Sequence, residues 1–350
     1  MRGLEMLSPE LPVPSHFAPE RVGEVWRVPY QDIAAAAADW RAEHEIRAAA
    51  EDRLKVCLVL VDMQNTFCIP GFELFVGGRS GTGAVDDGRR LCRFIYRNLA
   101  NITKIIPTLD THQVMQIFHA IFLVDDNGDH PTPYSLITVE DVASGRWKFN
   151  PALSDQLQIS ADYGQKHLEH YTRQLRRSGK YDLTVWPYHA MLGGIGHAIV
   201  SSAEEAVFFH GVARYSQPDM HVKGGHPLTE HYSVLGPEVS TDCAGERLTE
   251  KSGKFVKVLR DYDAVIITGQ AKSHCVAWTI ADLLEDVIAH GSELASKIYL
   301  LEDCTSPVVV PGVIDYTDQA DEAFRRFRDS GMHVVRSTVA MEDWPGLGKP

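Results

Sequence analysis

Three residues with reactive side chains follow apolar stretches of the sequence, and together they could carry out covalent acyl transfer. Asp62 ends the stretch VCLVLVD, Lys223 lies in DMHVKGG, and Cys275 lies in VIITGQAKSHCV. A cysteine at the start of a helix experiences the positive end of the helix dipole, which lowers the pKa of its thiol. A lysine ammonium would stabilise the thiolate, and a carboxylate beside both could transfer protons. Backbone N–H groups around Cys275 could hold the oxyanion.

Each of these residues also has an ordinary structural interpretation. A buried cysteine is most often a small hydrophobic side chain. An aspartate that ends a strand often stabilises a turn, and a Lys-Gly pair such as Lys223–Gly224 is usually a solvated turn. The placement of all three residues after apolar stretches therefore makes the triad a hypothesis that coordinates can test.

A second set of residues could bind a metal ion. Asp110 and His112 form an Asp-x-His pair, and side chains two apart on a strand point to the same face. His189 is the best third ligand, because it ends the rigid Trp-Pro-Tyr-His segment just before a glycine-rich stretch. Three protein ligands leave coordination positions for water or substrate, as in catalytic metal sites. The alternative is a hydrogen-bonded pair at the end of a strand.

The elements that must position these residues follow from the apolar pattern. Residues 56–61 are a continuous apolar run, which is typical of a strand buried on both faces. Further apolar runs alternate with segments of helical periodicity along the chain. The pattern predicts strands at 56–61, 102–109, 265–268, 298–301 and 333–335, and helices at 33–50, 86–99, 275–290 and 316–330.

Strands separated by helices imply an α/β fold of three layers, in which helices cover both faces of a mostly parallel sheet. Ligands bind such sheets beyond the carboxyl ends of the strands, where the candidate residues are expected. Residues 1–50 are predicted to form an N-terminal extension with a helix, and residues 51–350 the main domain. The alternation is lost at about 120–182, which we interpret as an insertion that packs over one edge or caps the site.

Composition excludes several classes of protein. The 350 residues include 34 basic and 47 acidic side chains, a net charge of −13, which disfavours nucleic acid as a partner. No apolar run approaches the ~20 residues of a membrane span, and no secretory signal pattern begins the chain. The six cysteines never form a C-x-x-C pair, which favours reduced thiols. We therefore expect a soluble, cytoplasmic protein.

Five short motifs occur together in one order along the chain. They are D-x-Q-N-x-F-C at 62–68, D-x-H at 110–112, W-P-x-H at 186–189, K-G at 223–224 and G-x-A-x-x-x-C-V at 269–276. In this combination the chain resembles the nicotinamidase branch of the isochorismatase-like cysteine hydrolases. The resemblance covers about residues 55–336, outside the N-terminal extension and the insertion, and implies the Rossmann-like three-layer fold of that family.

The resemblance implies a role for each motif residue. Cys275 would be the nucleophile, Asp62 the general acid and base, and Lys223 the third member of the triad. The Gln270–Ala271 bond matches the cis peptide of the family, and the amides of Ala271 and Cys275 match its oxyanion hole.

The resemblance also implies a divalent metal held by Asp110, His112 and His189, with zinc expected first and iron or manganese as alternatives. In nicotinamidases the metal binds the pyridine nitrogen and orients the ring. Phe67 and Trp186 match aromatic positions that flank the ring. The expected substrate-binding residues are thus Phe67, Trp186, Gln64 and Gln270, with Gln64 supporting the nucleophile loop.

Several positions depart from the family pattern. Ala190 stands where a cysteine is common after the metal histidine, and Gln116 stands near a position that often holds a further histidine. The usual A-T-D-x-C-V reads Ala-Lys-Ser-His-Cys-Val from Ala271, with an added cation and no carboxylate beside the nucleophile. These changes leave the triad intact and leave amides other than nicotinamide open as substrates.

The expected function is a metal-dependent cysteine amidohydrolase of nicotinamidase type, which converts a small aromatic or heterocyclic carboxamide to its acid and ammonia through a thioester. One alternative is a related amidase that acts on a ureido or non-pyridine amide, and another is an isochorismatase-type hydrolase. A binding or scaffold protein without catalysis is the alternative from a different class. The expected partner is a small-molecule amide, and we expect a homo-oligomer.

Overall fold

The centre of the molecule is a six-stranded sheet in which every neighbouring pair of strands is parallel. The computed structural model describes residues 7–249, 253–290 and 292–347. The strand order across the sheet is β12 (His333–Val335), β9 (Ile298–Leu301), β8 (Ala264–Gly269), β1 (Val56–Val61), β2 (Lys104–Asp110) and β7 (His221–Lys223).

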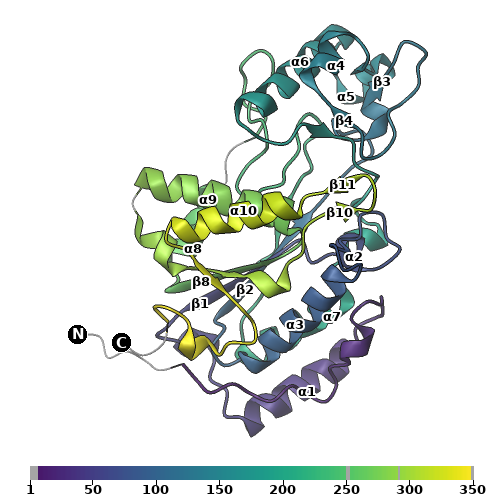
Figure 1. The fold of residues 1–350 in the computed structure, drawn as a ribbon. Coiled ribbons are helices and arrows are strands. Elements are labelled where there is room, and N and C mark those ends of the chain that lie inside the picture. Colours follow the sequence, from purple (N-terminus) through teal and green to yellow (C-terminus); the bar gives the residue numbers. More distant parts are fainter. Residues whose placement is uncertain (1–6, 250–252, 291, 348–350) are drawn as a thin grey trace.

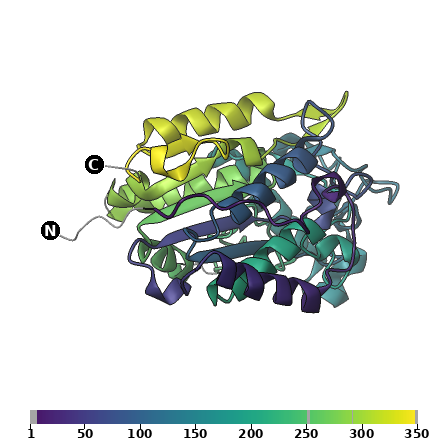
Figure 2. The same ribbon diagram turned by 90° about the horizontal axis from the view of Figure 1, so that it is seen from below.

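Helices cover both faces of this sheet. Figure 1 shows α3 (Gly83–Arg97) and α7 (Ser201–Arg214) below the sheet, and α8 (Gly253–Arg260), α9 (Ala277–His290) and α10 (Thr317–Asp329) above it. The predicted three-layer α/β/α fold is confirmed. An additional helix, α1 (Tyr30–Glu43), packs on the outer side of α7, as Figure 2 shows from below.

Strand β1 shows why the apolar run 56–61 must be a central strand. All six of its residues are buried. Val56, Leu58 and Leu60 point into the core on the α3 and α7 side. The alternate residues at 57, 59 and 61 join the core formed with α8, α9 and α10. Burial of such side chains contributes about 1.5–3 kcal/mol each, so this register positions the end of β1 firmly.

Some predicted boundaries are wrong, each for a local reason. The N-terminal helix ends at Glu43 rather than residue 50, because Glu45 adopts a left-handed backbone (φ 50°) that cannot continue a helix. Helix α9 begins at Ala277 rather than Cys275, because residues Lys272–Val276 form a π-helical turn ahead of it. Strand β2 extends to Asp110, so this candidate ligand is part of the strand itself.

The region predicted as an insertion folds into a lobe at the top of Figure 1. The Tyr181 hydroxyl, at the end of this lobe, donates to the backbone oxygen of Ser273 at 3.2 Å, next to the candidate nucleophile. Two short antiparallel strand pairs and three helices make up the lobe: β3 (Leu123–Val124) with β5 (Lys148–Phe149), β4 (Leu136–Ile137) with β6 (Leu183–Thr184), α4 (Val139–Ala143), α5 (Ser154–Leu157) and α6 (Ala161–Arg177).

The remaining regular elements are short and lie near the carboxyl edge of the sheet. They are α2 (Asn65–Cys68) and the antiparallel pair β10 (Val309–Val310) and β11 (Ile314–Asp315). Among the described residues, no helix is both long enough and apolar enough to cross a bilayer.

A buried histidine on α7 predicts how stability depends on pH. The His210 Nε2 hydrogen bonds to the Ile102 carbonyl oxygen at 2.8 Å, and burial lowers the pKa of His210 to about 4. The His210 imidazole becomes protonated near pH 6.5 in the unfolded chain and only near pH 4 in the folded chain. The stabilisation is therefore complete above pH 6.5 and falls as the pH drops, by about 2 kcal/mol at pH 5.

We expect His210→Gln, which keeps a donor for the Ile102 carbonyl, to remove this share of the acid sensitivity. Urea unfolding at pH 7 and pH 5 measures the effect. The loss of unfolding free energy between the two pH values should be about 2 kcal/mol smaller in the variant than in the wild type. An equal loss in both proteins would contradict the assignment.

Candidate active site

The three residues of the predicted triad meet at the carboxyl edge of the sheet. Asp62 follows β1, Lys223 ends β7, and Cys275 lies in the π-helical turn after β8. The Lys223 Nζ lies 2.9 Å from the Asp62 Oδ2 and 3.5 Å from the Cys275 Sγ. The sulfur also lies within 4.8 Å of a carboxylate oxygen of Asp62 and of Asp110. A thiol, an ammonium and a carboxylate are thus within reach of one another, as nucleophilic catalysis requires.

The backbone at the ends of β1 and β8 makes this approach possible. Asp62 adopts a left-handed conformation (φ 46°), which turns the chain sharply after β1. Gly269 ends β8 with φ 121°, and a Cβ there would lie 2.0 Å from the Val61 carbonyl oxygen. Only glycine fits at this position, so the turn that carries Cys275 can start directly beside Asp62.

Burial dominates the electrostatics of the resting triad. Burial raises the pKa of the Cys275 thiol well above its usual value, and Lys223 opposes this shift while Asp62 and Asp110 add to it. Burial also raises the pKa of Asp62, again against the attraction of Lys223. The prediction of a lowered thiol pKa is therefore wrong for the resting site. The sulfur keeps its proton, hydrogen bonded to Asp62, until a reaction moves it.

The three predicted metal ligands form one buried cluster. A carboxylate oxygen of Asp110 and a ring nitrogen of each of His112 and His189 all lie within 4.8 Å of one another. Both Nε2 atoms face the Asp110 Oδ2, at 2.8 Å for His112 and 3.7 Å for His189. The Nδ1 atoms face the carbonyl oxygens of Gly224 (3.3 Å) and Pro187 (2.8 Å). This is the arrangement of metal-binding histidines, whose second nitrogen is fixed by a carbonyl or carboxylate.

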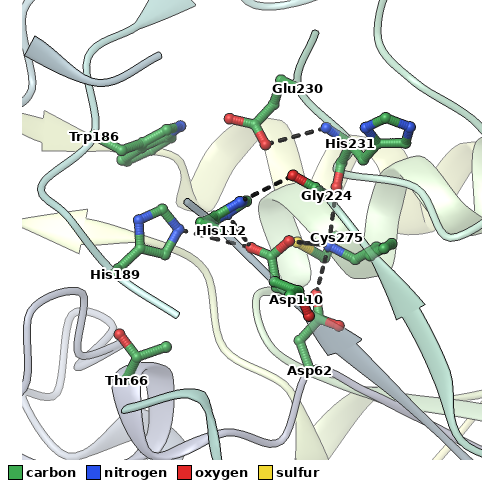
Figure 3. Close-up of polar contacts among 12 residues, drawn as sticks. Asp62, Thr66, Asp110, His112, Trp186, His189, Gly224, Glu230, His231 and Cys275 are labelled. Atoms are coloured by element: carbon green, nitrogen blue, oxygen red, sulfur yellow. Dashed lines mark hydrogen bonds and ion pairs between the residues drawn. The ribbon is translucent and has the colours of Figure 1, made fainter. Parts of the chain in front are cut away.

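Asp110 connects the metal cluster to the triad. Its Oδ1 accepts a hydrogen bond from the Lys223 Nζ at 2.9 Å, while its Oδ2 faces the histidines (Figure 3). Burial alone would raise the pKa of Asp110, but His112 and Lys223 together hold it well below its usual value. Gly224 must be a glycine here, because a Cβ would lie 2.7 Å from the Asp110 Oδ1. The carboxylate is therefore fixed and ionised, as a metal ligand should be.

A fourth histidine lies near this cluster without joining it. The ring centroid of His119 is 6.1 Å from that of His112 and 6.4 Å from that of His189. Its Nδ1 lies 3.0 Å from the Val114 carbonyl oxygen. The group of ligand atoms that lie within 4.8 Å of one another contains His112 and His189 but not His119.

A pocket opens directly onto the cysteine and the metal cluster. About 350 Å³ of space free of protein atoms lies in and at the mouth of this pocket, open solvent included. The predicted Phe67, Trp186 and Ala271 line it together with Asp110, His189 and Cys275. The other lining residues are Leu74, Glu230, Tyr232, His274 and Val308.

Gln64 and Gln270, predicted around the substrate, lie behind the pocket wall. The Gln64 amide donates to the Asp110 carbonyl oxygen at 2.8 Å and accepts from the Asp110 N–H at 2.8 Å, so it fixes the end of β2 rather than the nucleophile loop. The Gln270 amide donates to the Asp87 Oδ2 at 2.9 Å. The Gln270–Ala271 peptide bond is cis, as the resemblance implied. Both glutamines therefore hold backbone near the reactive groups.

Three polar residues of the pocket were not predicted from the sequence as parts of the site: Glu230, Tyr232 and His274. Burial raises the pKa of Glu230 to about 8, so this carboxyl carries its proton at neutral pH. The Tyr232 hydroxyl accepts a hydrogen bond from the Trp186 indole at 3.0 Å. Glu230 and Tyr232 follow Lys223 in an irregular polar segment, and no periodicity or motif there could have indicated a buried wall.

Comparisons with known proteins found similar solved structures, all of them at low sequence identity. No family model matches the sequence, and no curated protein matches it. A nicotinamidase/pyrazinamidase of Acinetobacter baumannii is 18% identical with a TM-score of 0.47, covering 82% of this chain and 99% of its own. A yeast nicotinamidase bound to the inhibitor nicotinaldehyde is 18% identical (TM-score 0.49, 80% of this chain and 99% of its own).

A third solved structure is the pyrazinamidase of Pyrococcus horikoshii in complex with zinc. It is 19% identical, with a TM-score of 0.42, and the match covers 81% of this chain and 99% of the other. The chemistry proposed below rests on the side chains of this chain.

Proposed function

We propose that this protein is a metal-dependent cysteine amidohydrolase of the nicotinamidase branch, which converts a small ring carboxamide to its acid and ammonia. The observation that carries the proposal is the convergence of Asp62, Lys223 and Cys275 beside a pocket that Cys275 lines together with two residues of the metal cluster, Asp110 and His189. The motif resemblance supports the same reaction.

The first step is attack by sulfur on the amide carbon. Asp62 takes the proton from the Cys275 thiol, and the Lys223 ammonium, 3.5 Å from the sulfur, stabilises the thiolate that forms. The N–H groups of Ala271 and Cys275, both at the pocket, would hold the oxyanion. Asp62 then returns the proton to the departing nitrogen, which leaves as ammonia.

The second step is hydrolysis of the thioester. Water takes the place of ammonia, Asp62 removes a proton from it, and the hydroxyl adds to the acyl carbon. The tetrahedral species collapses to the carboxylic acid, and the sulfur recovers its proton. The raised pKa of Asp62 suits this exchange, because it makes the carboxylate a stronger base toward the thiol and toward water.

Asp110, His112 and His189 would hold the divalent ion, and the donor set of one carboxylate and two imidazoles fits zinc, iron or manganese. When bound, the ion supplies a Lewis-acid anchor for a ring nitrogen of the substrate. Phe67 and Trp186 would then lie against the ring, since both line the pocket beside His189.

Ammonia release from an amide panel tests this function. We expect the metal-loaded protein to hydrolyse ring carboxamides, including nicotinamide, and to prefer them to open-chain ureido compounds such as N-carbamoyl amino acids. A preference for ureido compounds would instead support the related amidase. Release from no member of the panel would contradict the proposal and favour a binding protein.

Metal content gives a separate prediction. We expect His189→Gln to weaken metal binding by at least about 100-fold, since even outer-shell partners of metal ligands are worth 10–100-fold. Competition with a coloured chelator, followed by elemental analysis, measures the affinity. His226→Gln is the matched control, because His226 is a histidine outside the metal cluster. The metal affinity of this variant should equal that of the wild type. Equal affinities in all three proteins would reject the cluster as the metal site.

A further inference from the structure

His274 precedes the nucleophile and forms part of the pocket wall. Its side chain is buried, with 3% exposed. Four aromatic rings surround the imidazole at centroid distances of 4.7–5.4 Å: Tyr181, Trp186, Tyr232 and Tyr316. The catalytic steps above make no use of this imidazole.

The hydrogen bonds of Ser273 favour one tautomer of this imidazole. The Ser273 Oγ accepts from the Val308 N–H at 3.0 Å and lies 2.8 Å from the His274 Nδ1. The hydroxyl hydrogen of Ser273 is satisfied when it points to Nδ1, which then accepts. Burial lowers the pKa of His274 to about 3, so the ring is neutral. The single ring proton is therefore on Nε2.

That Nε2–H group is buried and has no hydrogen-bond partner among the residues that the structure describes. Buried donors are nearly always paired, and an unpaired one calls for a function or a ligand. The His274 side chain lines the pocket that contains Cys275, so a molecule in the pocket is the available partner.

We propose that the His274 Nε2–H donates a hydrogen bond to an acceptor atom on the substrate ring, so that His274 determines which ring carboxamides are preferred. This inference rests on the proposed function and deepens it. The substrate class is a carboxamide whose ring carries a neutral acceptor, such as a second ring nitrogen or a ring carbonyl, in addition to the atom that faces the metal cluster.

The charges around the pocket favour a neutral acceptor over an anionic one. The described residues that line the pocket include no lysine or arginine. They do include Glu230, whose carboxyl is buried. The nearby Lys272 ammonium is bound to Asp321 at 2.6 Å and lies over the Phe324 ring. A ring carboxylate that faced His274 would thus be buried with no lysine or arginine of the pocket lining to pair with, which is costly.

The competing interpretation is a contact between the Nε2–H and an aromatic face. The rings of His274 and Tyr316 are nearly perpendicular, at 89° and 4.7 Å. An N–H group that rests on a ring face makes only a weak hydrogen bond to that ring, and it would not contribute to recognition of the substrate. The experiment must therefore separate a donor that faces the ligand from one that faces Tyr316.

A ring-nitrogen scan makes this separation. Nicotinamide is compared with the four carboxamides in which one further ring CH is replaced by nitrogen: pyrazinamide, pyrimidine-5-carboxamide, pyridazine-3-carboxamide and pyridazine-4-carboxamide. In the wild type we expect one of them to exceed nicotinamide by about tenfold in kcat/KM, the worth of one hydrogen bond. In His274→Phe the kcat/KM of this best diazine, relative to nicotinamide, should fall to the relative kcat/KM of the least favoured diazine. Comparison between the two proteins cancels the intrinsic reactivity of each amide.

Two further variants keep the test decisive. His274→Gln retains a side-chain N–H and should retain part of the preference, whereas Tyr316→Phe keeps the ring beside His274 and should retain all of it. If the kcat/KM values of the diazines relative to nicotinamide were the same in the wild type, His274→Phe and His274→Gln, the inference would be overturned. A ¹⁵N NMR spectrum that places the proton of His274 on Nδ1 would overturn it as well.

Binding measurements distinguish this inference from the proposed function. In the Cys275→Ala protein, with and without His274→Phe, calorimetry gives the relative affinities of the five amides without any turnover. A ring preference that depends on His274 supports the inference even if the wild type hydrolyses none of them. Turnover of all five amides with no preference that depends on His274 rejects the inference and leaves the proposed function intact.

Discussion

Cys275→Ala is expected to reduce amide hydrolysis by at least about 10⁴-fold, because loss of a covalent nucleophile removes the reaction path itself. The alanine leaves Asp62 and Lys223 paired at 2.9 Å and deletes only the sulfur, so the fold should persist. Ammonia release at saturating amide, with metal content and melting temperature recorded on the same samples, measures the effect.

The matched control is Cys243→Ala. Cys243 is a partly exposed free cysteine outside the pocket, and its replacement should change ammonia release by less than about twofold. If Cys275→Ala retained a tenth or more of the wild-type rate, sulfur could not be the nucleophile, and a water activated at the metal cluster would become the better mechanism.

Lys223→Met is expected to reduce both stability and activity. Its Nζ lies 2.9 Å from the Asp62 Oδ2, 2.9 Å from the Asp110 Oδ1 and 2.9 Å from the His231 carbonyl oxygen. Without the ammonium, two buried carboxylates face each other with no shared cation, which costs about 3–5 kcal/mol. The thiolate loses its counter-charge as well, so we expect kcat/KM to fall at least about 10³-fold.

The pH dependence of this variant identifies the cause. Without Lys223 the folded-state pKa of Asp62, already raised by burial, rises further and that of Asp110 rises as well, so the variant regains stability when one of these carboxyls is protonated. Urea unfolding should therefore show a larger difference from the wild type at pH 7 than at pH 5. Lys166→Met, which removes an exposed lysine paired with Asp162, should change stability by less than about 1 kcal/mol at either pH. If Lys223→Met lowered the free energy of unfolding equally at both pH values, the cause would be lost packing instead.

The sequence predicts the sheet and the reactive residues well, for physical reasons. A strand buried on both faces must be continuously apolar, so β1 and β9 have the predicted bounds. Ligands of parallel sheets gather at the carboxyl ends of strands, so Asp62 and Asp110 could be placed without coordinates. Lys223 and Cys275 also follow apolar stretches, and the order of the motifs supported their grouping with Asp62, although residues far apart in sequence show no contact by pattern alone.

The walls of the pocket and the state of its groups could not be predicted in this way. Glu230 lies in an irregular segment whose burial depends on tertiary packing. The pKa of Cys275 depends on desolvation, which a helix-dipole argument leaves out. The π-helical turn at Lys272–Val276 likewise has no signature in residue types. The division at residue 50, the homo-oligomer and the cytoplasmic location stay predictions.

Interception of the acyl group by hydroxylamine tests whether a thioester forms on Cys275. Hydroxylamine is close in size to the ammonia that must leave the pocket, so it can reach a thioester on Cys275. With the best amide of the panel, the account predicts that hydroxylamine diverts product from the carboxylic acid to the hydroxamic acid in proportion to its concentration, with one ammonia released per amide consumed. Carboxylic acid as the sole product at every hydroxylamine concentration, at an undiminished rate of ammonia release, would contradict it.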